Sequence, residues 1–208
     1  MERVRLYDEK GNRGRKEGTG LFTRALMEAY PWLPVEEDGR LHDPQLRENF
    51  VERLFALHEL NTLRANGLTR RGLLDFHSRY KLQLLAHHQA GYREIGPFVA
   101  SMHQWQDLDA FFVAYRDKLM AILKNTASRK NHTNVLMHIQ GYFRERLNSR
   151  QRGELRDVIL DYRAGLLPIL APLTLLKHYL AEYPDRYLQA QNYFDPYPQD
   201  LALRLGVN

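Results

Sequence analysis

Residues 128–143, SRKNHTNVLMHIQGYF, combine an apolar helical repeat with side chains that could contact a nucleotide. Four polar side chains follow one another at steps of four and so share one side of a helix: Lys130, Asn134, His138 and Tyr142. A cation, an amide, an imidazole and a phenol suit phosphate, ribose and base edges. Arg129 stands at the helix start, which is an attractive place for an anion. These residues are candidate nucleic-acid contacts.

The same stripe has a structural interpretation that the sequence leaves open, namely a polar face turned to solvent. Val135, Leu136 and Ile139 fall on the opposite side, which predicts a buried face there. His132 begins that face, so we expect a hydrogen-bonded core histidine. Gly141 costs a helix about 1 kcal/mol relative to Ala. We interpret it as a point of close approach by a backbone or a ligand.

Residues 76–88, FHSRYKLQLLAHH, carry a second set of candidate contacts. On a helix His77, Lys81 and His88 fall within about 40° of one another. A His and a Lys four residues apart repel each other when both are charged, so this pairing is slightly unfavourable without a purpose. We predict either a solvated helix flank or a stripe that faces residues 128–143 across a shared groove.

Arg163 is a further candidate phosphate contact, in the stretch DYRAGLLP. It lies just before a helix end that Gly165 is expected to cap. An ion pair with a neighbouring carboxylate is the more ordinary role for such an arginine.

Several kinds of chemistry are excluded or lack a template in this sequence. The 208 residues contain no Cys, which excludes disulfides, thiolate zinc sites, cysteine-ligated iron–sulfur clusters and a Cys nucleophile. We find no HExxH, GxSxG or phosphate-loop motif and no tightly spaced carboxylate pair. Catalytic residues stay unassigned, and we expect no metal site and no cofactor. A histidine-only metal site assembled in three dimensions stays open.

The composition is that of a basic globular protein. Thirty Lys and Arg residues against 25 Asp and Glu give a net charge of +5, which suits a polyanionic partner without requiring one. No run approaches 18 consecutive apolar residues, so we expect no membrane association through a spanning helix. The N-terminal residues are charged and lack an apolar signal core. We expect a cytoplasmic protein.

The elements that must position these residues are almost all helices. From Asp43 onward the apolar spacing predicts about seven or eight helices, with caps at Asp43, Thr69 and Ser149 and a last short helix between Asp185 and Phe194. Before that point we expect a strand at residues 4–7, a mobile loop at 8–20 and a helix at 21–30. The predicted fold is mainly α, with a helical domain at 43–208 behind a small α/β-like lead-in at 1–42.

Four stretches together resemble the YbgA-like family, a helical bacterial domain without a defined function. They are HSRYKLQLLAH, RKNHTNVLMHIQGYF, DYRAGLLPILAPLTLLKHYL and YLQAQNYFDPYP, and the resemblance covers residues 50 to 208. It implies a domain that in many relatives follows a TudS-type thiouracil desulfidase domain.

The lead-in is similar to the C-terminal part of such a TudS-type domain, through ERVRLYD, GLFTRALMEAYPWLPVEEDGRLHDP and LRENFVERLFA. TudS-type domains hold a [4Fe–4S] cluster through Cys residues, and this chain has none. The resemblance therefore implies a remnant without desulfidase activity, as in a fragment of a fused protein or a short form. Fused relatives are linked to sulfur removal from thiolated uridine in tRNA, which makes the helical part the candidate for holding RNA.

Three functions follow as hypotheses. The first is an RNA-binding or substrate-positioning module, with tRNA as the expected RNA and a fused or separate TudS-like domain as partner, without iron–sulfur catalysis of its own. The second is an enzyme that uses a His/Lys/Asn groove for acid–base chemistry on a nucleotide. The third is a protein-interaction or structural domain. The sequence leaves the oligomeric state unassigned.

Overall fold

The computed structural model describes residues 4–6, 15–18, 20–201 and 203–204. Within these residues the chain forms nine α-helices and one antiparallel pair of strands, so the prediction of a mainly α fold is confirmed. The helices are α1 (Leu21–Ala29), α2 (Pro44–Ala65), α3 (Arg70–His87), α4 (Gln89–Ala100), α5 (Leu108–Leu123), α6 (Arg129–Tyr142), α7 (Ser149–Ala164), α8 (Leu170–Glu182) and α9 (Arg186–Gln189). Short 3-10 turns are η1 (Asp38–His42), η2 (Ser101–Gln104) and η3 (Gln199–Leu201). No helix in this described part is long and apolar enough to cross a bilayer.

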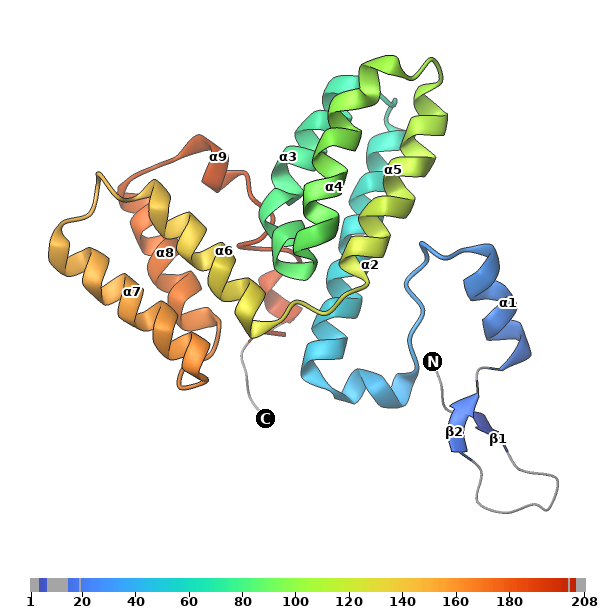
Figure 1. Ribbon diagram of the computed structural model, residues 1–208, viewed down its shortest axis with the longest axis horizontal. Coiled ribbons are helices and arrows are strands. Elements are labelled where there is room, and N and C mark those ends of the chain that lie inside the picture. The colour runs from blue at the N-terminus through green and yellow to red at the C-terminus, as the bar shows by residue number, and fades with distance from the viewer. Residues whose placement is uncertain (1–3, 7–14, 19, 202, 205–208) are drawn as a thin grey trace.

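The helices pack as two halves that share α3 (Figure 1). One core lies among α2, α3, α4 and α5 and includes Phe76, Phe111 and Phe112. The other lies among α6, α7, α8 and the chain around α9, and takes Leu82 and Ala86 from α3. Because α3 contributes to both cores, it carries buried side chains on most of its circumference.

Helix starts follow the expected caps, with one correction. The Asp43 carboxylate accepts hydrogen bonds from the N–H groups of Gln45 and Leu46, and the Thr69 hydroxyl accepts one from Gly72. The cap of α7 is Asn148 instead of the predicted Ser149, because Asn148 forms a reciprocal capping box with Gln151. Helix α6 ends at Tyr142, earlier than predicted, and residues 143–147 form turns before α7 begins.

The C-terminal segment crosses from the second half back to the first. The predicted helix between Asp185 and Phe194 is confirmed only for Arg186–Gln189. The next residues leave the helix because Gln191 donates from Nε2 to the Ser78 carbonyl at 2.8 Å, and the Asn192 N–H donates to the Arg79 carbonyl at 3.0 Å. These bonds to α3 direct the tail toward α2.

The lead-in is attached to the first half through Trp32. The Arg116 guanidinium lies 4.0 Å from the centre of the Trp32 ring, and Trp32 packs against the first core. The predicted strand is confirmed at Val4–Leu6 (β1), which pairs with β2 (Arg15–Gly18). The predicted loop at 8–20 is therefore wrong at 15–18, because those residues find a strand partner; its residues 8–14 and 19 lie outside the described part. The domain boundary at 42/43 stays a prediction.

Helix α1 lies apart from the helical halves, and none of its residues is buried (Figure 1). Leu21 and Phe22 are its most exposed apolar side chains.

Gly165 ends α7 with a left-handed backbone, at φ 85°, so the predicted glycine cap is confirmed. Its N–H donates to the Tyr162 carbonyl, and the Leu166 N–H donates to Asp161. We expect Gly165→Ala to lower the free energy of unfolding by about 1–2 kcal/mol, because a Cβ disfavours this conformation. Urea denaturation would measure the change.

Gly141 provides the matched control for that substitution. It is exposed within α6, and a Cβ added there would meet no atom within 4 Å. Gly141→Ala is therefore expected to stabilise the protein by up to about 1 kcal/mol. Equal changes in the two variants would contradict the strain assigned to Gly165. The same free space shows that the interpretation of Gly141 as a point of close approach within this chain is wrong.

Candidate functional site

A cleft of about 640 Å³ lies where the two halves of the protein meet. Its walls come from the start of α2, the connection between α5 and α6, the start of α6, the end of α7 and the C-terminal tail. The polar side chains that line it are Gln45, Glu48, Asn49, Glu52, Thr126, Ser128, Arg129, His132, Tyr162 and Arg204. A volume between about 300 and 1,000 Å³ is usual for small-molecule sites.

Arg204 is the central cation of this cleft, and its side chain is only 6% exposed. Its Nε lies 2.6 Å from Glu48 Oε1, and its Nη2 lies 3.1 Å from Glu52 Oε1. The two carboxylates raise the pKa of Arg204 above its usual range even though burial opposes the charge. Arg204 therefore joins the C-terminal tail to α2 through a buried ion-pair network.

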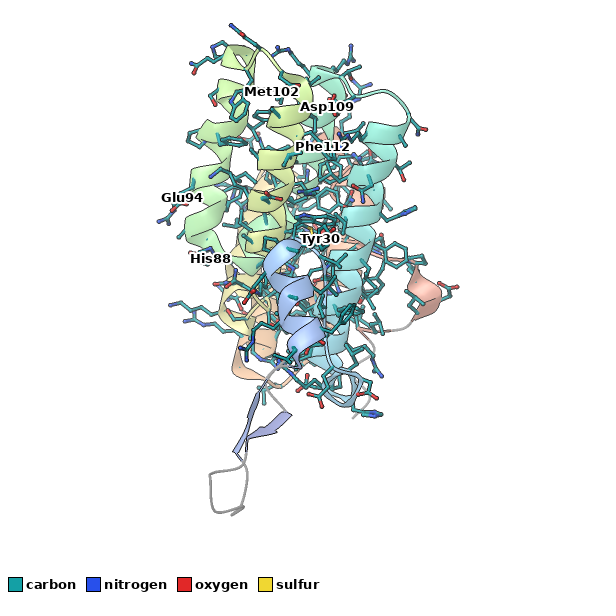
Figure 2. The ribbon with its side chains drawn as sticks, turned by 90° about the vertical axis from the view of Figure 1, so that its right-hand side faces the viewer. Tyr30, His88, Glu94, Met102, Asp109 and Phe112 are labelled. Atoms are coloured by element: carbon teal, nitrogen blue, oxygen red, sulfur yellow. The ribbon has the colours of Figure 1, made fainter. Side chains whose placement is uncertain are left out.

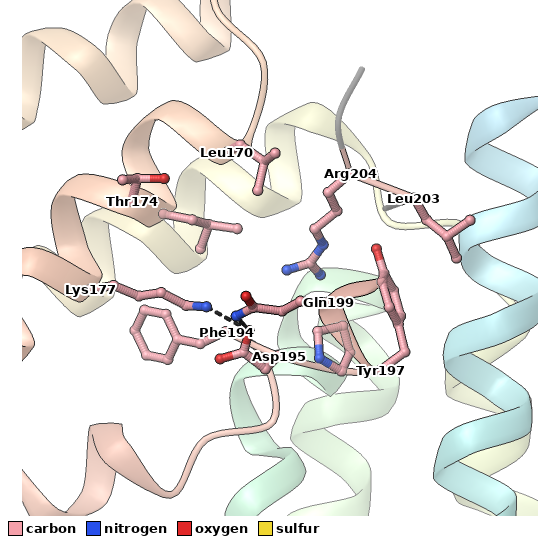
Figure 3. A pocket seen from close by; sticks show the side chains of 11 residues that line it. Leu170, Thr174, Lys177, Phe194, Asp195, Tyr197, Gln199, Leu203 and Arg204 are labelled. Carbon is pink, nitrogen blue, oxygen red and sulfur yellow. Dashed lines mark hydrogen bonds and ion pairs between the residues drawn. The ribbon is translucent and has the colours of Figure 1, made fainter. Parts of the chain in front are cut away.

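Arg204 also separates the cleft from a second cavity of about 310 Å³ (Figure 3). Figure 3 shows Arg204 beside Tyr197, with the guanidinium carbon 5.8 Å from the centre of the Tyr197 ring, while Asp195 accepts bonds from Lys177 and Gln199. The Tyr197 hydroxyl donates to Glu48 at 3.1 Å, so both cavities border the same network.

His87 extends the network to the connection between the two halves. Its Nε2 lies 2.9 Å from Glu52 Oε2, and its Nδ1 lies 2.6 Å from the carbonyl oxygen of Asn125. These two neighbours are acceptors, and the Asn49 amide lies farther from Nδ1, at 3.4 Å, so both ring nitrogens carry a proton and the ring is an imidazolium. Burial lowers the pKa of His87, but the bonds to Glu52 and Asn125 outweigh burial and raise it overall.

Glu52 is the buried anion that faces both cations. Burial opposes its charge, but the hydrogen bond from His87 and the charges of His87 and Arg204 lower the pKa of Glu52 to about 2. The carboxylates of Glu48 and Glu52 and the cations Arg204 and His87 balance one another. The network therefore has a net charge of zero when all four groups are ionised.

Glu48 differs from Glu52 because its side chain is 23% exposed, against 5% for Glu52. Burial and the charge of Glu52 raise the pKa of Glu48, while Arg204 and Tyr197 partly offset them. Both hydrogen bonds to this carboxylate use Oε1. Among the described residues, no hydrogen-bond partner reaches Oε2, which leaves this oxygen available to a molecule in the cleft.

His132 lines the cleft as a neutral imidazole. Its Nδ1 lies 3.0 Å from the hydroxyl of Tyr193, which is fully buried. Burial, with Arg204 as the largest nearby charge, lowers the pKa of His132 to about 3. The prediction of a hydrogen-bonded histidine is confirmed, but the side chain is half-buried and borders the cleft instead of filling the core.

Arg129 forms the rim of the cleft at the start of α6. Its Nη1 donates to the Tyr162 carbonyl at 2.6 Å, and its guanidinium lies 4.8 Å from the centre of the Tyr162 ring. No described carboxylate forms an ion pair with Arg129, so its charge is uncompensated. Lys130 follows Arg129 in the chain, and Arg163 follows Tyr162. Both side chains are exposed, and neither has a described ion pair.

The predicted polar stripe on α6 is exposed, and the predicted buried face opposite it is confirmed by Val135, Leu136 and Ile139. Tyr142 stacks on Tyr187 with ring centres 5.7 Å apart, and the His138 ring lies 5.6 Å from that of Tyr142. The other members, Lys130 and Asn134, are also exposed. None of these four residues lines the cleft. Among the predicted site residues, Arg129 is the one that does.

The prediction that the second stripe is a surface feature is wrong at His77. His77 is buried in the first half, where its Nδ1 lies 3.2 Å from the Tyr115 hydroxyl. Burial, with Lys81 as the nearby charge, lowers the pKa of His77 to about 4. His88 instead caps α4, because its Nδ1 accepts from the Gly91 N–H; Figure 2 shows His88 at that end of the helix. The predicted shared groove is therefore not formed by these residues, and Lys81 is half-buried.

Sequence reasoning missed the residues of the ion-pair network. The expectation of no carboxylate pair is wrong, since Glu48 and Glu52 lie one turn apart on α2 and meet at Arg204. The available signal was weak: His87 shares a helix side with Tyr80 and Leu84, which are buried. No group of three His, Asp or Glu residues in the described part of the chain is arranged to hold a metal ion.

Comparisons with known proteins place this architecture in a family. Residues 81–198 match the family model described as "Protein of unknown function (DUF1722)". The chain is 53% identical over 152 residues to "Uncharacterized protein YbgA" of Escherichia coli (strain K12), which covers 73% of this chain and 90% of that relative. No solved structure matches. Because the family model spans more than half of the chain, the protein belongs to the DUF1722 family and is YbgA-like.

Proposed function

We propose that the chain is an RNA-binding module, with tRNA as its expected RNA, that contacts the polyanion at the rim of the cleft. The observation that carries this proposal is the contact of Arg129 with Tyr162, which brings the start of α6 and the end of α7 together. Three cations gather at this contact through the chain, because Lys130 follows Arg129 and Arg163 follows Tyr162, and none of the three has a described ion-pair partner. Such a cluster binds phosphates at little cost, because no existing ion pair has to break.

The exposed side of α6 supports contact over a longer stretch of RNA. Lys130 and Tyr142 are twelve positions apart, which corresponds to about 18 Å along a helix. Tyr142 is 41% exposed and stacks on Tyr187, so it offers an ordered aromatic surface. Aromatic side chains contribute about 1–3 kcal/mol per stacked base in single-stranded RNA recognition.

The resemblance to TudS-associated proteins supports a role for this RNA binding in the removal of sulfur from tRNA. We propose that the module positions thiolated tRNA for a TudS-like desulfidase domain, fused or separate. The chain has no Cys, so a cysteine-bound iron–sulfur cluster would have to come from that partner. The alternative of a protein-interaction domain predicts no RNA affinity, which the following experiment measures.

The substitution Lys130→Glu tests the proposed face. Lys130 is exposed and lies opposite the apolar side of α6, so the fold should be retained. We expect several-fold weaker binding of purified total tRNA, and a log–log salt slope smaller by about 0.7–0.9 for each phosphate that the variant no longer neutralises. Filter binding at a series of salt concentrations gives both quantities.

Arg71→Glu is the control, because it makes the same charge change at the end of α3 that is farther from the cleft. Arg71 is the second residue of α3, whose last residue touches Asn125 beside the cleft, so it lies about 25 Å away along the helix. We expect nearly unchanged tRNA binding in this variant. If both variants bind equally well, or the wild type does not bind tRNA, the proposed function is wrong.

A further inference from the structure

We infer that the cleft takes up one nucleotide of the bound RNA, with a phosphate against Arg129 and the base or ribose against Glu48 and His132. This inference rests on the proposed function and names the part of the RNA that enters the protein. The cleft has a volume of about 640 Å³, which is large enough for a nucleotide by the usual range of small-molecule sites, about 300–1,000 Å³.

Arg129 supplies the phosphate contact at the entrance. Its planar guanidinium is held against the Tyr162 ring and by the Tyr162 carbonyl, so the charge is fixed at the rim before a ligand arrives. One Nη1 hydrogen bond is described, which leaves other guanidinium N–H groups to donate. Arginine is well suited to phosphate because these donors have fixed directions.

The inner part of the cleft presents one acceptor and one donor. Oε2 of Glu48 has no described partner and accepts hydrogen bonds. Tyr193 is fully buried and Nδ1 of His132 is its one described hydroxyl partner, so its O–H donates there because it would otherwise be buried unpaired. A neutral imidazole then carries its proton on Nε2, which donates. An acceptor beside a donor matches the edge of a nucleobase or the hydroxyls of a ribose.

The charge distribution favours a ligand with one negative charge at one end and none at the other. The network of Glu48, Glu52, His87 and Arg204 balances internally, so a second anion inside the cleft would face carboxylates without a free cation. The rim carries the uncompensated charge of Arg129. A phosphodiester-linked nucleotide has this pattern, with its charge at the backbone and a neutral base.

The test measures binding of the four ribonucleoside 5′-monophosphates by calorimetry, with inorganic phosphate as a separate probe. We expect saturable nucleotide binding that Arg129→Gln weakens by roughly tenfold, as for the loss of a charge-assisted hydrogen bond. Glu48→Gln replaces the free acceptor by a donor and is expected to change the preference among the four bases. Glu145→Gln is the control, because Glu145 is exposed between α6 and α7 and does not line the cleft.

The same variants are tested for tRNA binding and, by circular dichroism, for folding. Absence of nucleotide binding while tRNA binds normally would overturn this inference and leave the RNA function standing. Nucleotide binding that depends on Arg129 without tRNA binding would keep the nucleotide site and overturn the RNA function. If inorganic phosphate binds as tightly as the nucleotides, or Glu48→Gln and Glu145→Gln behave alike, the assigned roles of the inner cleft are wrong.

Discussion

Arg204→Met is expected to lower the free energy of unfolding by about 3–5 kcal/mol, the range for breaking a buried ion pair by removing one partner. Met keeps much of the side-chain length but removes the cation that Glu48 and Glu52 share. The two carboxylates lie close enough that the charge of Glu52 raises the pKa of Glu48. Without Arg204 they repel each other in a region that water reaches poorly. Urea denaturation at pH 7 measures the loss.

Two further variants separate this mechanism from a general effect of losing an arginine. Arg156 pairs with Asp157 on the surface, where ion pairs contribute little, so Arg156→Met should leave stability nearly unchanged. Adding Glu52→Gln to Arg204→Met removes one uncompensated carboxylate. The double variant should therefore lose less than the sum of the two single variants. Strict additivity would show that Arg204 and Glu52 do not interact as described.

Local features of the fold could be read from the sequence because they depend on neighbouring residues. Asp43 and Thr69 cap helices with their own side chains, and Gly165 supplies the left-handed residue that ends α7. The buried face of α6 also followed from spacing, because α6 buries one continuous side. These predictions require no knowledge of distant parts of the chain.

His77 shows where spacing is insufficient. A helix with one buried side leaves its polar residues in solvent, but α3 is shared by both halves and buries His77 and Gln83 as well as its apolar residues. The bond to Tyr115 that accommodates His77 comes from α5. Nothing within α3 indicates that α5 covers this polar side, so spacing alone predicts it at the surface.

The ion-pair network at the cleft depends on contacts even farther apart in the sequence. Arg204 and Glu48 are 156 residues apart, and they meet because the tail turns at Gln191 and Asn192 and crosses toward α2. A lone arginine near the end of a chain carries no local signal for such burial. The place of Arg129 at a helix start predicts an anion contact, which stays a prediction, but nothing in the local sequence indicates that Tyr162 anchors its guanidinium.

His87→Ala is expected to remove a pH dependence of stability that the wild-type protein shows. His87 faces Glu52, Asn49 and the Asn125 carbonyl, with the charge of Arg204 and the neutral ring of His132 nearby. Its pKa is raised in the folded state, so the folded protein holds this proton at a pH where the unfolded chain, with a histidine pKa of about 6.5, has lost it. The stabilisation that protonated His87 gives the folded state is therefore complete below about pH 6.5.

As the pH rises from about 6.5 toward the raised pKa of His87, stability should fall with a slope of up to about 1.4 kcal/mol per pH unit. Glu52 acts in the opposite direction and does not interfere, because its pKa of about 2 places its contribution at acid pH, where stability falls as Glu52 is protonated. Urea denaturation of wild type and His87→Ala between about pH 5.5 and 9, values chosen to span this window, isolates the difference. His178→Ala, an exposed histidine, is the control. Parallel stability curves for wild type and His87→Ala would mean that His87 is not held as an imidazolium between Glu52 and Asn125.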